Sequence, residues 1–114
     1  SILATDLPVT SRQLKRILKR TGVGIARTGG YTGHGSGEVM IGFTTANRIP
    51  SGCEEELLHL SAIPEHVINR AFLAAAEAEQ EAILNSMTAA KQTRGRKGEL
   101  YYSLAEYLND REPE

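Results

Sequence analysis

The stretch GGYTGHGSGEVMIGFTT, residues 29–45, joins a glycine-rich loop to an apolar strand. Five of the nine residues in 29–37 are glycine, so this segment is predicted to be a loop, because glycine weakens helices and strands. Apolar residues occupy both sides of the strand expected over residues 38–45, with Val39, Ile41 and Phe43 on one face and Met40 and Gly42 on the other. Such a strand is typical of a sheet that is covered on both faces.

On either side of this stretch, the sequence predicts an α+β fold with few strands. The expected elements are a strand end at 2–4, a helix at 11–27 capped by Thr10 or Ser11, a strand at 54–61, a helix at 64–90, and a strand end and short helix within 100–108. A helix over 54–61 is the less favoured alternative, and residues 110–114 are expected to fray. About three strands make a narrow sheet, so the chain is expected to need a partner chain to complete its core.

The composition is typical of one soluble globular domain. The chain has 114 residues, of which 40% are hydrophobic and 24% are charged, and its single Cys allows no internal disulfide framework. No apolar run approaches the roughly 20 residues that span a bilayer, and no signal peptide is evident at the start, so no membrane association is expected. Nucleic acid, metal and cofactor are not expected either, and the cytoplasm is slightly favoured over other compartments.

Positive charge gathers at the start of the chain. Residues 1–30 hold six Lys and Arg against Asp6, whereas residues 38–81 hold eight acidic residues against two arginines. A phosphate-binding basic helix is one interpretation, and it would fit a non-enzymatic binding module. A solvated helix face, or one docked on acidic neighbours, is the favoured alternative, because the net charge is −1 and only 5% of the residues are aromatic.

Ser36 and Glu38 are the leading candidates for chemistry. A phosphate loop would end in Gly-Lys-Ser or Gly-Lys-Thr, and the segment Gly35-Ser36-Gly37-Glu38 has no Lys. Two residues apart in an extended chain, the hydroxyl and the carboxylate leave on the same side, where they can relay hydrogen bonds and bind an amine. For these two residues taken alone, an ordinary exposed turn is the favoured interpretation. Ser1 would complete such a site, because an N-terminal serine carries its free α-amine as a candidate base. The missing Met agrees either with a trimmed start or with internal cleavage before Ser1.

Several segments together resemble the L-aminopeptidase/D-esterase and β-peptidyl aminopeptidase family. They are Ala4-Thr5-Asp6, Leu14-Lys15-Arg16, the run from Gly24 to Gly29, the run from His34 to Glu38, the run from Phe43 to Ile49, and the helical run from Glu77 to Asn85. The match keeps its order over most of the chain, and it is similar to the smaller, C-terminal subunit that these enzymes release by cleaving their own precursor before a serine. The resemblance therefore implies that residues 1–114 are a single C-terminal (β) subunit of a two-chain hydrolase domain.

The resemblance also implies a fold, a reaction and partners. The fold would be a four-layer α/β/β/α sandwich like that of N-terminal-nucleophile hydrolases, completed by a larger N-terminal (α) subunit, with the pairs assembling further. Ser1 would be the nucleophile of an aminopeptidase, amidase or esterase acting on substrates with a free amino terminus. Ser36 and Glu38 would assist, and Gly35, Gly37 and Glu38 would bind the substrate. A related acyltransferase of the ornithine-acetyltransferase type is the alternative.

The chain departs from the family pattern at its start. Similar enzymes place the nucleophilic serine about three residues further ahead of Ala4-Thr5-Asp6 than Ser1 stands. An odd shift along a strand reverses the face that a side chain meets, so in a regular strand Ser1 is expected to point away from the site. This departure has three interpretations. The strand has a bulge, three residues were lost from the start, or the nucleophile is not Ser1.

Overall fold

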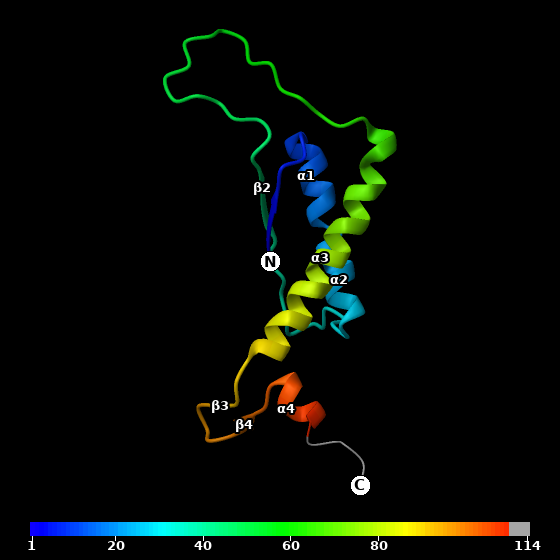
Figure 1. Ribbon diagram of the computed structural model, residues 1–114, viewed down its shortest axis with the longest axis vertical. Coiled ribbons are helices and arrows are strands. Elements are labelled where there is room, and N and C mark those ends of the chain that lie inside the picture. The colour runs from blue at the N-terminus through cyan, green and yellow to red at the C-terminus, as the bar shows by residue number, and fades with distance from the viewer. Residues whose placement is uncertain (110–114) are drawn as a thin grey trace. The chain divides into compact units, whose positions relative to one another are not determined.

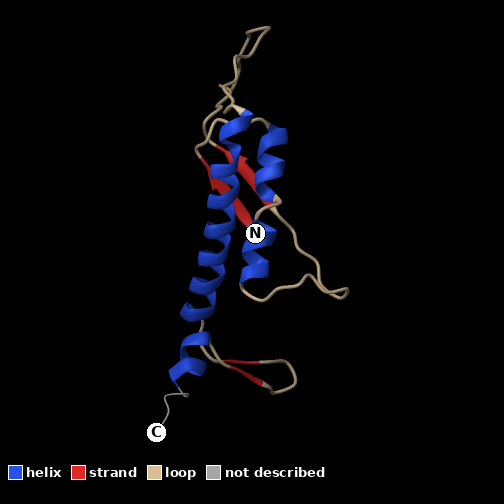
Figure 2. Cartoon of the chain, turned by 90° about the vertical axis from the view of Figure 1, so that its right-hand side faces the viewer, coloured by secondary structure: helices blue, strands red, loops and turns tan. Residues whose placement is uncertain are grey.

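Two short parallel strands with helices on one side form the first part of the chain (Figures 1 and 2). The computed structural model describes residues 1–109, so the expected fraying of residues 110–114 lies outside the described part. The chain divides into two units, Ser1–Gln80 and a second that begins at Glu81. The elements in chain order are β1 (Ile2–Thr5), α1 (Ser11–Leu18), α2 (Thr21–Arg27), β2 (Ile41–Thr44), the 3-10 helix η1 (Glu65–Val67), α3 (Ile68–Ala89), β3 (Thr93–Arg94), β4 (Leu100–Tyr101) and α4 (Leu104–Asn109). The α+β class is confirmed.

The sheet of the first unit has one covered face and one bare apolar face. Residues 2–5 of β1 pair in parallel with residues 41–44 of β2. On the covered face, a Cβ on Gly42 would lie 2.9 Å from the side chain of Leu18 in α1, so a larger residue here would push that side chain aside. On the other face, Ile41 and Phe43 are 59% and 50% exposed. The alternation of faces is as predicted, but within residues 1–109 only one of the two faces is covered.

The single helix predicted over residues 11–27 is two helices. Thr21, which is fully buried, donates its hydroxyl to the carbonyl oxygen of Leu18 at 2.8 Å and so takes an acceptor from the helix backbone. The N–H of Arg20 donates to the carbonyl oxygen of Ile17 at 2.8 Å, a tight three-residue turn. The polar side chain at position 21 therefore ends α1 and lets α2 start at once.

The start of α1 is tied to the chain that precedes α3. Thr10 caps the helix as expected, and it forms a reciprocal capping box with Gln13. Gln13 is only 5% exposed, and its Nε2 donates to the carbonyl oxygen of Ile63 at 2.8 Å. The small apolar core beside this contact is formed by Val9, Ile17, Ile68, Ala71 and Ala75.

The helix predicted over residues 64–90 is present as η1 followed by α3. Small side chains let α2 approach it closely, since Ala75 and Ala76 are 3% and 4% exposed. A Cβ on Gly24 of α2 would lie 2.6 Å from the carbonyl oxygen of Ala76 and 2.6 Å from the Cβ of Glu79. The glycine at this position is therefore needed for the close packing of α2 on α3.

The strand predicted over residues 54–61 is wrong. These residues have no regular structure, and their side chains are exposed, so no neighbouring strand within the described residues offers them backbone partners. Asn47 holds the two ends of the loop 48–60 together, because its side-chain amide exchanges two hydrogen bonds of 2.9 Å with the backbone of Ser61. We call residues 48–60 the arm; in Figure 1 it is the long green loop that follows β2.

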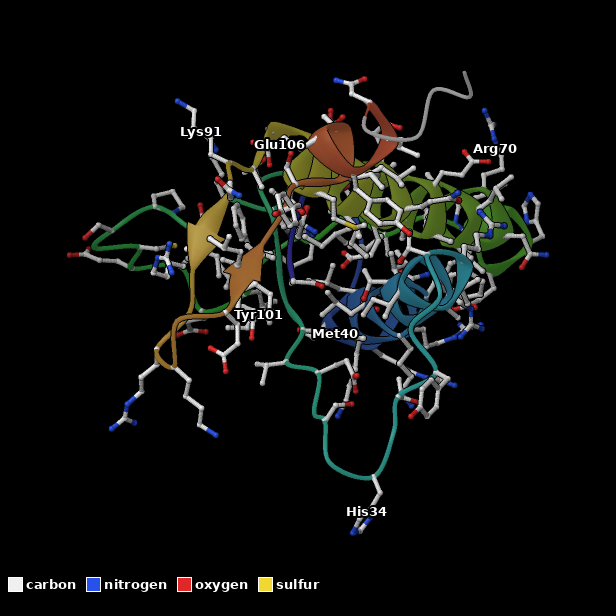
Figure 3. The ribbon with its side chains drawn as sticks, turned by 90° about the horizontal axis from the view of Figure 1, so that it is seen from below. His34, Met40, Arg70, Lys91, Tyr101 and Glu106 are labelled. Carbon is white, nitrogen blue, oxygen red and sulfur yellow. The ribbon has the colours of Figure 1, made fainter. Side chains whose placement is uncertain are left out.

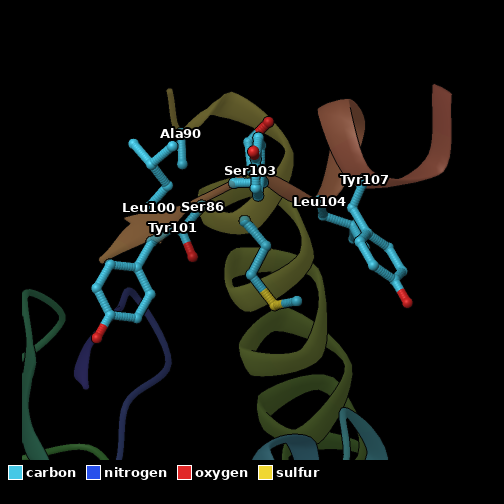
Figure 4. Close-up of a pocket in the computed structure, with 9 residues that line it drawn as sticks. Ser86, Ala90, Leu100, Tyr101, Ser103, Leu104 and Tyr107 are labelled. Atoms are coloured by element: carbon cyan, nitrogen blue, oxygen red, sulfur yellow. The ribbon is translucent and has the colours of Figure 1, made fainter. Parts of the chain in front are cut away.

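The second unit is the end of α3, the β3–β4 hairpin and α4. Thr93 pairs with Tyr101 and Arg94 with Leu100 in antiparallel register. An apolar groove lies between the last turns of α3, β4 and α4, with Tyr101 and Tyr107 on its rim (Figure 4). Within residues 1–109, no helix combines the length and apolar character that crossing a membrane requires.

Candidate active site

The loop between α2 and β2 brings Ser36 and Glu38 together. The Ser36 hydroxyl lies 3.4 Å from Oε1 of Glu38 and 3.2 Å from the carbonyl oxygen of Gly33. The backbone N–H of Ser36 donates to the same carbonyl oxygen at 3.0 Å. Both side chains are exposed. The two groups thus share one side of the chain as their spacing predicts, and their hydroxyl and carboxylate are free to meet a ligand.

The same loop forms an open hollow around this pair. Residues 29–36 and Glu38 line a space of about 390 Å³, within the range typical of small-ligand sites. Thr32 has a φ of 51°, a conformation that a β-branched residue rarely adopts, so the loop carries local backbone strain. A Cβ added to Gly35 or Gly37 would meet no atom within 4 Å, which leaves their backbone open to a ligand. His34 points outward at the tip of the loop (Figure 3).

Ser1 occupies a different place. Its hydroxyl donates to Oε1 of Glu79 in α3 at 2.6 Å, and its amine donates to the carbonyl oxygen of Val39 at 2.8 Å. The N–H of Ile41 donates to the Ser1 carbonyl oxygen at 3.0 Å, so the parallel ladder sets Ser1 beside Met40. Among residues 1–109, no hydrogen bond joins Ser1 to Ser36 or Glu38. The strand shows no bulge, and the Ser1 side chain faces the helices.

Glu79 is the residue at this end of the sheet that sequence reasoning missed. It lies four residues after Ala75 and eight after Ala71, so it shares the helix stripe that these buried alanines define. A carboxylate placed on a buried stripe is unusual, and it could have been recognised as a group in need of a partner.

Part of the basic helix face docks on its own chain. Arg16 of α1 forms an ion pair with Glu65, and the guanidinium of Arg20 lies 4.2 Å from the centre of the Phe72 ring. The hydrogen bond from Arg16 holds the pKa of Glu65 below its ordinary value. In the described part of the chain, no three His, Cys, Asp or Glu side chains gather closely enough to hold a metal ion.

Comparison with known proteins decides the family. Residues 1–101 match the model of peptidase family S58, and they include the loop, Ser36, Glu38 and both strands of the first sheet. The chain belongs to peptidase family S58. This S58 chain is 34% identical over 97 residues to a β-peptidyl aminopeptidase of Sphingosinicella microcystinivorans, and 29% identical over 104 residues to one of Sphingosinicella xenopeptidilytica. The matches cover 85% and 90% of this chain but 24% and 26% of the two relatives.

Solved structures give the same result for the S58 fold. A protein of Pyrococcus horikoshii superposes with a TM-score of 0.84 at 46% identity, covering 95% of this chain and 31% of that one. The L-aminopeptidase D-Ala-esterase/amidase of Ochrobactrum anthropi, described as a variant of the N-terminal-nucleophile hydrolase fold, superposes with a TM-score of 0.83 at 33% identity, covering 96% and 32%. A Burkholderia β-aminopeptidase follows at 0.78 and 29%, covering 96% and 35%. The S58 chain thus spans about a quarter to a third of the length of these relatives.

Proposed function

We propose that this S58 chain is the C-terminal (β) subunit, residues 1–114, of a two-chain serine hydrolase that removes N-terminal residues from peptides, amides or esters. The observation that carries the proposal is the Ser36–Glu38 pair, which lines an open hollow inside the region that matches the S58 model. The similarity to enzymes described as aminopeptidases supports the substrate class, a molecule with a free amino terminus.

The proposed chemistry is acyl transfer through a serine ester. Glu38 binds the ammonium group of the substrate by a charge-assisted hydrogen bond, which places the neighbouring carbonyl carbon beside the serine. The serine oxygen attacks that carbon, its proton passes by way of Ser36 to the leaving amine, and the C–N bond breaks. Water then hydrolyses the ester and restores the hydroxyl. Backbone N–H groups at Gly35 and Gly37 are proposed to contact the substrate, and part of the oxyanion site comes from the partner chain.

The bare sheet face supports a partner chain. Ile2, Val39 and Ile41 are 77%, 73% and 59% exposed on that face, which is a cost in water unless another layer covers it. We propose that a larger N-terminal (α) subunit from the same precursor packs its own sheet there, which completes a four-layer α/β/β/α sandwich. Pairs of subunits are proposed to assemble into higher homo-oligomers.

The nucleophile is proposed to be a serine at the head of β1, where Ser1 is the candidate within this chain and self-cleavage before it would free its amine. Two arrangements are compatible with that proposal. In one, Ser1 leaves Glu79 and β1 shifts toward Gly37 by three positions, about 10 Å at the rise of a parallel strand. In the other, the strand continues upstream in unchanged register, and the position three residues before Ser1 lies beside Gly37. The regular ladder between β1 and β2 favours the second arrangement.

A serine-acylating inhibitor separates these arrangements. The two-chain protein is treated with the inhibitor, digested and mapped by mass spectrometry. An adduct on Ser1 supports the first arrangement, and an adduct on an upstream serine supports the second and removes Ser1 as the nucleophile. A folded, untreated sample that releases no free acid from an aminoacyl ester refutes the hydrolase proposal. Transfer of the acyl group to an added amine, in place of hydrolysis, supports the acyltransferase alternative.

The role of Glu38 is tested with a charge-neutral variant. Glu38→Gln is expected to lower kcat/KM for substrates with a free amine by roughly 10- to 100-fold, because the amide oxygen still accepts a hydrogen bond but lacks the negative charge that strengthens its bond to the ammonium group. Glu54→Gln removes the same charge from the arm and serves as the control. An unchanged kcat/KM for Glu38→Gln would exclude amine binding by this carboxylate.

A further inference from the structure

A single hydrogen bond joins the first strand of the S58 chain to its long helix. The Ser1 hydroxyl donates to Oε1 of Glu79 at 2.6 Å, across 78 positions of sequence. Glu79 is only partly exposed, and within residues 1–109 the hydroxyl of Ser1 is the hydrogen-bond partner of its carboxylate. A charged acceptor at this distance makes a strong bond.

The helix that carries Glu79 has little freedom to move. The Cβ of Glu79 is one of the atoms that a side chain at Gly24 would strike, at 2.6 Å, so α2 and α3 are in close contact at this residue. The neighbouring Ala76 is buried between the two helices at 4% exposure. The Glu79 carboxylate is therefore held in place on the covered side of the sheet.

The hydrogen bond between Ser1 and Glu79 fits only one register of β1 against β2. Ser1 lies beside Met40, and its backbone bonds to the two residues that flank Met40. The Ser1 nitrogen donates to the Val39 carbonyl oxygen, and the Ile41 N–H donates to the Ser1 carbonyl oxygen. A slip of one residue would turn the Ser1 side chain to the bare face and break its bond to Glu79. The bond thus opposes sliding of β1 along β2, the motion that would displace whatever lies beside Gly37.

We propose that Glu79 is a positioning residue of the S58 site: by holding Ser1, it holds the head of β1 in the register that presents the nucleophile to Ser36 and Glu38. The inference rests on the proposed function and on the second arrangement of the nucleophile described above. Glu79 acts through the strand and does not touch the substrate.

The test compares four variants of the two-chain protein with an aminoacyl p-nitroanilide as substrate. Glu79→Ala and Ser1→Ala are each expected to lower kcat about tenfold with KM changed less than twofold, and the double variant is expected to be no slower than either single one. Glu79→Gln should retain most of the activity, because its amide oxygen still accepts the Ser1 hydroxyl. Glu77→Gln is the matched control, an exposed carboxylate on the same helix.

Hydrogen exchange supplies a readout that is independent of turnover. The Ile41 N–H, which donates to Ser1, is expected to exchange faster in Glu79→Ala than in Glu77→Gln. Unchanged kcat and unchanged exchange in Glu79→Ala would overturn the inference, and so would complete loss of turnover in Ser1→Ala, because that result makes Ser1 the nucleophile. If the unmodified protein lacks hydrolase activity, the proposed function fails, and the exchange at Ile41 alone shows whether Glu79 holds the strand.

Discussion

Replacing Gly24 by alanine tests the packing that brings α2 onto α3. The added Cβ would lie 2.6 Å from the carbonyl oxygen of Ala76, 2.6 Å from the Cβ of Glu79 and 2.9 Å from the backbone nitrogen of Gln80. Ordinary contacts begin near 3.4 Å, so the two helices would have to separate by about 0.8 Å. Two of the three atoms belong to the helix backbone, which cannot swing aside as a side chain can.

The expected size of the effect follows from two opposing contributions. Overpacking a well-packed site costs about 1–3 kcal/mol, and backbone obstacles favour the upper end of that range. Alanine in place of glycine in a helix returns about 1 kcal/mol of helix propensity. The net loss in the free energy of unfolding is therefore about 2 kcal/mol.

Gly22→Ala in the same helix is the matched control. The nearest atom to a Cβ at Gly22 is the Cε of Met40 at 3.6 Å, an ordinary contact with a flexible side chain. This variant is expected to keep its helix-propensity gain and to unfold at slightly higher urea concentration than the unmodified protein. Urea unfolding followed by far-UV circular dichroism measures both. A Gly24→Ala protein that is as stable as Gly22→Ala would refute the close approach of the two helices.

Three further predictions concern other contacts. The lowered pKa of Glu65 means that its pair with Arg16 stabilises the fold above the ordinary Glu pKa of about 4.3, and that this contribution disappears as the pH falls below that value. The Tm of Glu65→Gln should therefore fall less steeply in acid than the Tm of the unmodified protein. Parallel curves of Tm against pH for the two proteins would contradict this. Asn47→Ala removes both bonds to Ser61, so limited proteolysis should cut the arm several-fold faster, and an unchanged cleavage rate would show that the arm is held otherwise. Phe43→Asp places a charge on the bare sheet face and should abolish co-purification with a larger partner chain, whereas retained association would place the partner elsewhere.

Local signals in the sequence predicted the local structure well and the long-range structure poorly. The cap at Thr10, the alternation in β2 and the nearness of Ser36 to Glu38 all depend on residues within a few positions of one another. The sequence does not predict the break between α1 and α2, because Thr21 fits a helical pattern. Only the folded chain buries Thr21, where its hydroxyl donates to the Leu18 carbonyl oxygen. The alternating leucines of the arm resemble a strand, but a strand exists only where a partner supplies hydrogen bonds.

The position of Ser1 depends on contacts between residues that are far apart in the sequence. Its face of the strand follows from simple alternation, but its distance from Ser36 and Glu38 follows from the register between β1 and β2, whose paired residues are 39 positions apart. Near these strands, Gly42 lets Leu18 of α1 lie close to the sheet, and Glu79 of α3 accepts a hydrogen bond from the Ser1 hydroxyl. Neither contact has a signature within one segment. The ladder places Ser1 beside Met40 and not beside Gly37, so the pairing of two distant strands fixes where its side chain lies.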